Sequence, residues 1–239
     1  MFSNNDLKRL IVPLVIEQVL MSLMGAIDTV MVSNVSPSAI AAVSLVDSIN
    51  LLIVNLLAAL AAGGTVVCAQ YLGKGDMKQV KNSSNQLLLS VLAFSIVITI
   101  IFYLSHRQLL SLIFGSVEAD VMANSIKYFT ITMLSYPFVA LNSASSALFR
   151  AIGNSRLPMT IALASNGLNI IGNAILIFGL GMGVAGAAIP TLVSRIVAAL
   201  IILYFQHKPN QPITLDNIIS IRPDVPVIRT ILRIGIPSG

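Results

Sequence analysis

Two acidic side chains, Glu17 and Asp28, lie inside a long apolar stretch of the sequence, residues 7–32. The stretch is long enough to cross a bilayer core of about 30 Å as a helix. Successive residues of a helix are about 100° apart, so both carboxylates lie on one face of it. A bare carboxylate in hydrocarbon is costly, and two aligned acids therefore indicate a wet or protein-lined interior where charge is held or neutralised. A purely structural carboxylate bound to a neighbouring Ser or Asn is the alternative for each acid.

Further polar side chains recur at helical spacing in other apolar stretches. Asp47 and Asn50 are three residues apart. Asn169 and Asn173 are four residues apart in a later stretch. Amides and acids on one face of a membrane helix need partners from neighbouring helices or from water. Helix–helix hydrogen bonding and the lining of a cavity both explain this pattern.

Groupings of side chains typical of enzymes are absent from the sequence. The two histidines, His106 and His207, lie near the ends of apolar stretches, and Cys68 is the single cysteine. Disulfide formation within the chain is therefore impossible, and no His/Cys cluster has the spacing of a metal site. We expect neither an enzymatic activity nor a bound cofactor or metal.

The composition is that of an integral membrane protein. Hydrophobic residues make up 56% of the chain and charged residues only 10%, with a mean hydropathy of +0.91. Soluble domains carry about 25% charged residues. The net charge of +5 is explained by basic loops between membrane spans, so we expect no nucleic-acid partner. The first apolar run is too long for a signal peptide and lacks a cleavage site, which predicts an uncleaved first span.

The apolar stretches predict an all-α protein with a bundle of six transmembrane helices. Their lengths fit membrane helices, and none shows the alternation of a barrel strand. Pro137 predicts a kink in the fourth helix. The predicted spans are residues 10–33, 39–64, 87–105, 124–148, 159–180 and 185–205.

The distribution of basic residues predicts the orientation of these spans. With the N-terminus in the cytoplasm, eleven of the fourteen Lys and Arg residues fall in cytoplasmic segments. Arg107 and Lys127 fall outside, and Arg195 lies within the sixth span. The positive-inside rule therefore predicts cytoplasmic termini at both ends of the chain, with the basic segments in contact with lipid headgroups.

A short internal repeat predicts a second lobe. Residues 7–13 align without gaps to residues 231–237, sharing an Arg and a Pro, and the second copy follows an even number of spans and a polar linker. Parallel repeats of six spans produce this pattern. We therefore divide the chain into an N-terminal lobe at 1–206, a cytoplasmic linker at 207–230 and the start of a truncated second lobe at 231–239.

Several segments carry a family resemblance. They are IDTVMV at 27–32, QYLG at 70–73, LFRAIGNSRLP at 148–158, NIIGNAILIFG at 169–179 and GAAIPT at 186–191. In these segments the sequence resembles the multidrug and toxic compound extrusion (MATE) transporters. The resemblance implies one half of a two-lobe, twelve-helix transporter in the prokaryotic cytoplasmic membrane, which exports cationic or amphipathic molecules against H⁺ or Na⁺ entry.

The resemblance also assigns roles to individual residues. Asp28 matches the first-helix acid that binds the coupling cation, and Pro13 matches the proline about which that helix bends. Asn169 and Thr191 match polar groups near that acid. Asn173 departs from the archaeal-type branch, which has Asp there, so a mechanism with paired carboxylates does not apply unchanged.

These observations predict a cation-coupled antiporter lobe. Its cation site comprises Asp28, Asn169, Asn173 and Thr191, and its partners are membrane lipids, a small substrate and either a C-terminal lobe or a second copy of the chain. Two other functions remain open: a flippase for lipid-linked precursors and a non-transporting membrane scaffold. A flippase predicts a cleft richer in cations than acids. The predicted substrate cleft contains Glu17, Asp47 and Asn50.

Overall fold

The computed structural model describes most of the chain. The described residues are 4–115, 117–209, 211, 213–215 and 223–235. Parts of the predicted linker and of the second-lobe segment therefore lie outside the described residues. The same holds for Pro237, the second proline of the predicted repeat.

The described residues form helices joined by short turns, which confirms the all-α prediction. Five of the helical segments are long and apolar enough to cross a membrane. The elements are α1 (Asn4–Ser33), α2 (Pro37–Gly73), α3 (Met77–Phe114), α4 (Ala119–Thr132), η1 (Met133–Ser135), α5 (Tyr136–Ala151), α6 (Arg156–Asn173), η2 (Ala174–Gly179), α7 (Ala185–His207) and α8 (Val225–Gly235).

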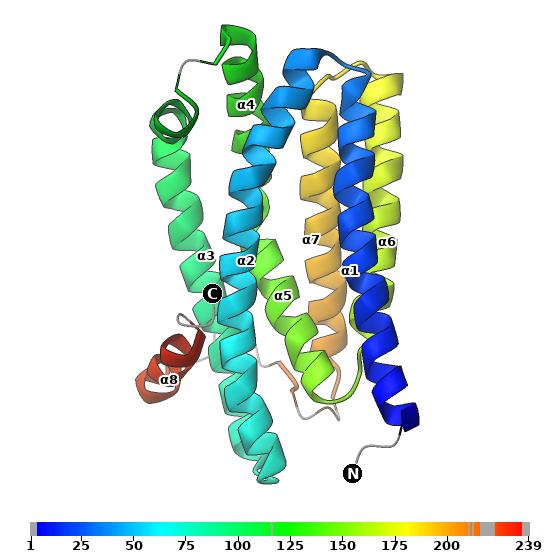
Figure 1. The fold of residues 1–239 in the computed structure, drawn as a ribbon. Helices are drawn as coiled ribbons and strands as arrows, with labels where there is room; N and C mark the ends of the chain where they lie inside the picture. The colour runs from blue at the N-terminus through cyan, green and yellow to red at the C-terminus, as the bar shows by residue number, and fades with distance from the viewer. Residues whose placement is uncertain (1–3, 116, 210, 212, 216–222, 236–239) are drawn as a thin grey trace.

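The predicted fourth span is broken into two helices. A 3₁₀ turn, η1, separates α4 from α5, and Pro137 lies in the first turn of α5. Proline has no N–H and clashes with the preceding turn, which explains the interruption just before it. Neither piece counts alone as a membrane-spanning helix, whereas Figure 1 shows α5 continuing below α4 across the height of the bundle.

The second and third helices extend well beyond the predicted spans. α2 continues to Gly73 and α3 begins at Met77, because polar residues at their ends remain helical outside the apolar core. The connecting turn contains Gly75 at a φ of 74°, and the Asp76 side chain caps α3 by accepting from the Gln79 N–H over 3.1 Å. The two helices are therefore longer than their apolar segments, and a short turn joins them.

The helices pack as a bundle in which α2 has a central place. It contacts α3, α4, α5 and α8, whereas α1 packs mainly on α6, and α6 packs on α7. Figure 1 shows the start of α1, the α2–α3 turn and the end of α7 at the same end of the bundle. The chain from α1 to α7 therefore starts and ends at the same end of the bundle, as an even number of membrane crossings requires.

Close approach of α6 and α7 depends on a glycine. A Cβ added at Gly172 would lie 2.7 Å from Cβ of Pro190 on α7. Real Cβ atoms do not approach that closely, so a side chain here requires the backbones to separate. Small residues of this kind allow membrane helices to pack tightly.

Replacing Gly172 by Ala is therefore expected to destabilise the protein by about 1–3 kcal/mol through overpacking. The matched control is Gly167→Ala on the same helix, where an added Cβ meets nothing within 4 Å. Thermal unfolding in detergent measures both variants. Equal stability of the two variants would show that α6 and α7 separate without cost.

Candidate functional site

The four residues of the predicted cation site lie together between α1, α6 and α7. Asp28 is 8% exposed, and its Oδ1 accepts a hydrogen bond of 2.5 Å from Asn173 Nδ2. Asn173 also donates to Asn169 Oδ1 over 3.1 Å, and Asn169 Nδ2 lies 3.0 Å from Thr191 Oγ1. We call these residues the Asp28 cluster. The structure brings all four side chains together, while their role as cation ligands stays a prediction.

The Asp28 cluster is rich in oxygen atoms. In the alternative orientation, with its amide oxygen and nitrogen exchanged, Asn169 donates to Asp28 Oδ1 over 2.9 Å and accepts from Thr191 Oγ1 over 3.0 Å, and it no longer accepts from Asn173. Asn173 Oδ1 is buried and has no hydrogen-bond partner among the described residues. Buried acceptors normally have a partner, and carboxylate, amide and hydroxyl oxygens suit a small hard cation. The cluster can therefore hold a cation or a proton.

A π-helical segment follows the cluster directly. η2 begins at Ala174, one residue after Asn173, and its wide turns include a bond from Leu180 N–H to the Ile175 carbonyl over 3.0 Å. Such segments are rare and are frequent at functional sites. The sequence predicted one uninterrupted span here, because a π-helix has no residue signature distinct from that of an α-helix.

A second polar cluster links α2 with α4 and α5. Asp47 Oδ1 accepts from Asn50 Nδ2 and from the Tyr128 hydroxyl, each over 3.2 Å. The Tyr136 hydroxyl donates to Asn50 Oδ1 over 2.8 Å. These four residues form the Asn50 cluster. Asp47 and Asn50 were predicted as cleft residues, whereas the tyrosines were missed because a tyrosine in an apolar span is usually ordinary core.

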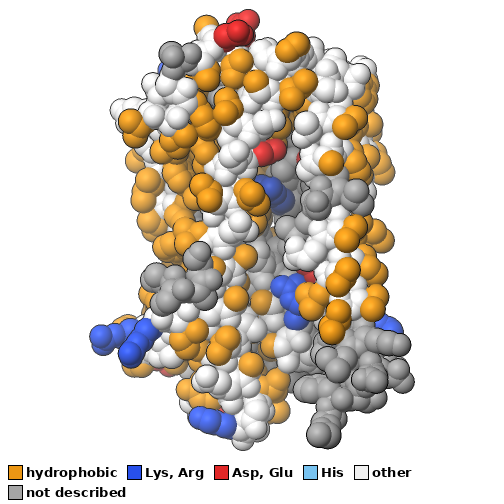
Figure 2. Space-filling model, viewed as in Figure 1, with side chains coloured by type: hydrophobic (Ala, Val, Ile, Leu, Met, Phe, Trp, Pro, Cys, Tyr) orange, Lys and Arg blue, Asp and Glu red, His pale blue; other side chains and the backbone are white. Residues whose placement is uncertain are grey.

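Arg195 on α7 lies near both clusters. Its Nη1 donates over 2.8 Å to Ser135 Oγ in η1, directly before Tyr136, and Thr191 lies one turn earlier on the same helix. Figure 2 shows acidic and basic side chains in the hollow between α2 and α1. Sequence reasoning did not include Arg195 among the site residues. Its position inside a predicted span, where a charge is costly, was the signal that could have identified it.

Glu17 lies apart from the Asp28 cluster. Both its carboxylate oxygens accept from Arg150 Nη1 in the last turn of α5, over 3.2 Å and 3.1 Å. Glu17 thus has a partner on another helix, as expected for a purely structural carboxylate. The partner is an Arg, whereas the expectation from the sequence was a Ser or Asn. Pro13 is buried within α1, which continues through it. A role for either residue in substrate binding or helix bending stays a prediction.

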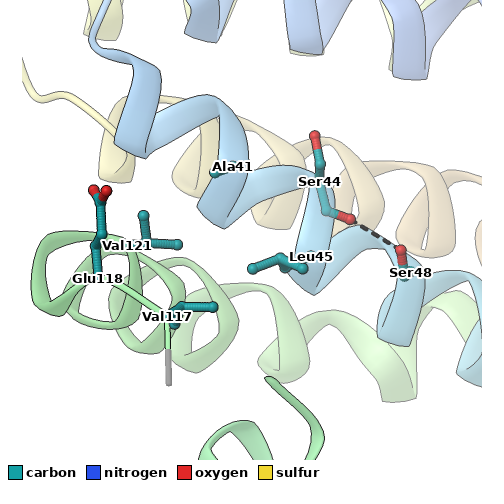
Figure 3. Close-up of a pocket in the computed structure, with 7 residues that line it drawn as sticks. All are labelled: Ala41, Ser44, Leu45, Ser48, Val117, Glu118 and Val121. Atoms are coloured by element: carbon teal, nitrogen blue, oxygen red, sulfur yellow. Dashed lines mark hydrogen bonds between the residues drawn. The ribbon is translucent and has the colours of Figure 1, made fainter. Parts of the chain in front are cut away.

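An open pocket of about 610 Å³ lies elsewhere, between α2 and the start of α4. Figure 3 shows Ser44 and Ser48 of α2 on one side and Glu118 on the other. The Ser48 hydroxyl donates to the Ser44 carbonyl over 3.0 Å. The lining of the pocket is mostly apolar and includes none of the predicted site residues. Among the described residues, no group of three His, Cys, Asp or Glu side chains could hold a metal.

Comparisons with known proteins agree on one family. The MatE family model matches residues 13–175. The probable multidrug resistance protein NorM of Thermotoga maritima is 29% identical over 239 residues, which covers 98% of this chain and 50% of that protein. A crystal structure of a MATE protein in the bent conformation has a TM-score of 0.89 at 27% identity, covering 98% of this chain and 52% of that one. The straight conformation has a TM-score of 0.82 at 26% identity with the same coverage. The chain thus spans about half the length of the relatives it matches.

Removing the Tyr136 hydroxyl is expected to destabilise the protein. Tyr136→Phe leaves the buried Asn50 Oδ1 without its donor, which costs about 1–3 kcal/mol. Tyr103→Phe, at an exposed tyrosine that is 53% accessible, serves as the control and changes stability by less than about 0.5 kcal/mol. Thermal unfolding of both variants measures the difference. A neutral Tyr136→Phe would mean that water replaces the hydroxyl.

Proposed function

The chain belongs to the MATE family of multi-pass membrane transporters, which are not enzymes, and we propose that it is a lobe of a cation-coupled antiporter exporting cationic or amphipathic small molecules. The observation that carries this proposal is the Asp28 cluster. A membrane carboxylate with amide and hydroxyl neighbours and one unpaired buried acceptor is suited to reversible binding of H⁺ or Na⁺.

Cation binding in this proposal changes the packing of α1. Asn173 on α6 donates a hydrogen bond to the Asp28 carboxylate on α1. A cation or proton that neutralises the carboxylate weakens this hydrogen bond and with it the contact between α1 and α6. Pro13 has no backbone N–H, so α1 lacks one helical hydrogen bond at this position and can bend there without breaking it. Transport follows if ion and substrate favour opposite arrangements.

The substrate cleft in this proposal is the hollow between α2 and α1. Asp47 and Asn50 attract a cationic group there. Glu17 contributes less, because Arg150 already neutralises its charge. The surface opposite this hollow comes from a C-terminal lobe or a second copy of the chain, since repeat-built transporters bind substrate where two halves meet.

The same proposal orients the chain with its basic end in the cytoplasm. The start of α1, the α2–α3 turn, the α5–α6 turn and α8 all lie toward one end of the bundle (Figure 1) and carry most of the Lys and Arg residues. That end faces the cytoplasm and anionic headgroups by the positive-inside rule.

Cysteine labelling tests this orientation. Cys68 is the single cysteine of the sequence, so replacing it by Ala gives a background without thiols. In that background Lys78→Cys is expected to react only with reagent added from the cytoplasmic side, and Arg107→Cys only from the outside. Labelling of both positions from one side would contradict the orientation.

The cation site is tested by Asp28→Asn in the purified chain in lipid nanodiscs. Addition of Na⁺ at constant ionic strength, or a lowering of the pH, is expected to stabilise the unmodified chain and so raise its unfolding temperature. At a hundredfold excess of the bound ion over its dissociation constant, the free energy of unfolding rises by about 2.7 kcal/mol. The variant keeps the shape of the side chain and loses this dependence. Asp120→Asn, at an exposed acid in α4, is the control and retains it. Retention of the ion dependence in Asp28→Asn would make this acid structural.

A further inference from the structure

The short helix α8 lies beside the lower part of α2, outside the bundle (Figure 1). Its apolar face packs on α2 and α3, where Ile231 is fully buried. Arg229 and Arg233 are exposed, and residues four apart share one face of a helix. α8 therefore has an apolar face on the protein and a basic face turned away from it.

The start of α8 is fixed to α3 by Asp224. Its Oδ2 accepts from Asn82 Nδ2 over 3.0 Å, and its backbone N–H donates to Gln86 Oε1 over 3.0 Å. Its Oδ1 accepts from the Val227 N–H over 3.4 Å and so caps the helix. The position of α8 on the lobe is thus specified by side-chain hydrogen bonds as well as by apolar contact.

The depth of α8 coincides with the boundary of the apolar core. The second predicted span ends at Gly64 and the third begins at Leu87. A Cβ added at Gly64 would meet the Leu87 side chain and would lie 3.1 Å from Ile231 Cγ2, so α8 docks where these two boundaries meet. Beyond this point α2 continues to Gly73, about 14 Å further along its axis. α8 therefore lies at the level of the lipid headgroups.

The basic face of α8 has no protein carboxylate to neutralise it. Within the described parts of the chain neither Arg229 nor Arg233 forms an ion pair, in contrast to Arg150, which pairs with Glu17. Figure 2 shows Lys or Arg side chains projecting from the surface where α8 lies. The planar fork of a guanidinium matches the oxygens of a phosphate. Basic amphipathic helices at this level of a membrane attract anionic lipids.

We propose that the outward face of α8 binds anionic phospholipid headgroups, with Arg229 and Arg233 contacting their phosphates. Net negative charge is what distinguishes these lipids from zwitterionic ones, and the arginines are attracted to it. Since α8 is fixed to α2 and α3, the lipid is held at a defined place on the lobe. The inference goes beyond the proposed function, because it requires a lobe that spans a membrane and no cation at Asp28.

Tryptophan fluorescence tests the proposal, because the sequence contains no tryptophan of its own. Thr230→Trp places one reporter beside Arg229 on the exposed face, and Val225→Trp, at a side chain 68% exposed, is a second reporter. The full chain is placed in phosphatidylcholine nanodiscs with equal fractions of either brominated phosphatidylcholine or brominated phosphatidylglycerol, which quench tryptophan on contact. The anionic lipid is expected to quench more strongly, as if about fivefold enriched for each arginine near it.

Matched variants identify the groups responsible. Arg229→Gln combined with Arg233→Gln is expected to remove the preference for phosphatidylglycerol and to leave quenching by brominated phosphatidylcholine unchanged. Arg107→Gln, at an exposed arginine near the opposite end of α3, leaves the preference intact. Val97→Trp, at an exposed position within the third predicted span, reports on lipid away from α8 and is expected to show no preference.

Equal quenching by the two brominated lipids in both Thr230→Trp and Val225→Trp would overturn the proposal. A preference that survives the loss of both arginines would do the same. Absence of quenching by either lipid would show that water, a second lobe or another copy of the chain covers this face, and would also contradict it. Ion-dependent unfolding and cysteine labelling measure other properties, so a failure here is distinguished from a failure of the proposed function.

Discussion

A charged or polar side chain within the bilayer must find its partner on another helix, and this requirement determines how the lobe is assembled. Lipid chains are as apolar as leucine, so burial of apolar surface does little to select which helix faces meet. The selection comes instead from bonds such as Asn173 to Asp28, Tyr136 to Asn50 and Arg150 to Glu17, each joining a different pair of helices. The hydrogen bonds that join the helices thus include those of the proposed cation site and of the proposed substrate cleft.

Local properties of the sequence predicted much of this arrangement. Apolar length identified the helices, and Pro137 located the break between α4 and α5. The Asp28 cluster was predicted by resemblance, and the spacing of Asn169 and Asn173 agreed, because residues four apart share a helix face. Helical periodicity carries this information without knowledge of the fold.

Pairings distant in sequence could not be predicted in the same way. Glu17 and Arg150 are 133 residues apart, and the sequence placed the acid in a cleft and the arginine in a cytoplasmic segment. Tyr128 and Tyr136 bond to Asp47 and Asn50 only because α2 packs on α4 and α5. Tertiary packing decides such contacts, and no local pattern encodes them.

The π-helical segment after Asn173 bears on how this chain is aligned with its relatives. An α-helix has about 3.6 residues in each turn, and a π-helix has more. η2 therefore contains more residues than an α-helical segment with the same number of turns. Loss of one residue between Ala174 and Gly179 would allow α-helical winding and leave the helix faces beyond it nearly in register with Asn173, because the wider turns accommodate the additional residue. A one-residue gap in this short interval therefore differs from a gap in an ordinary α-helix, which would rotate everything beyond it by about 100°. Positions on the two sides of η2 can stay equivalent across such a gap.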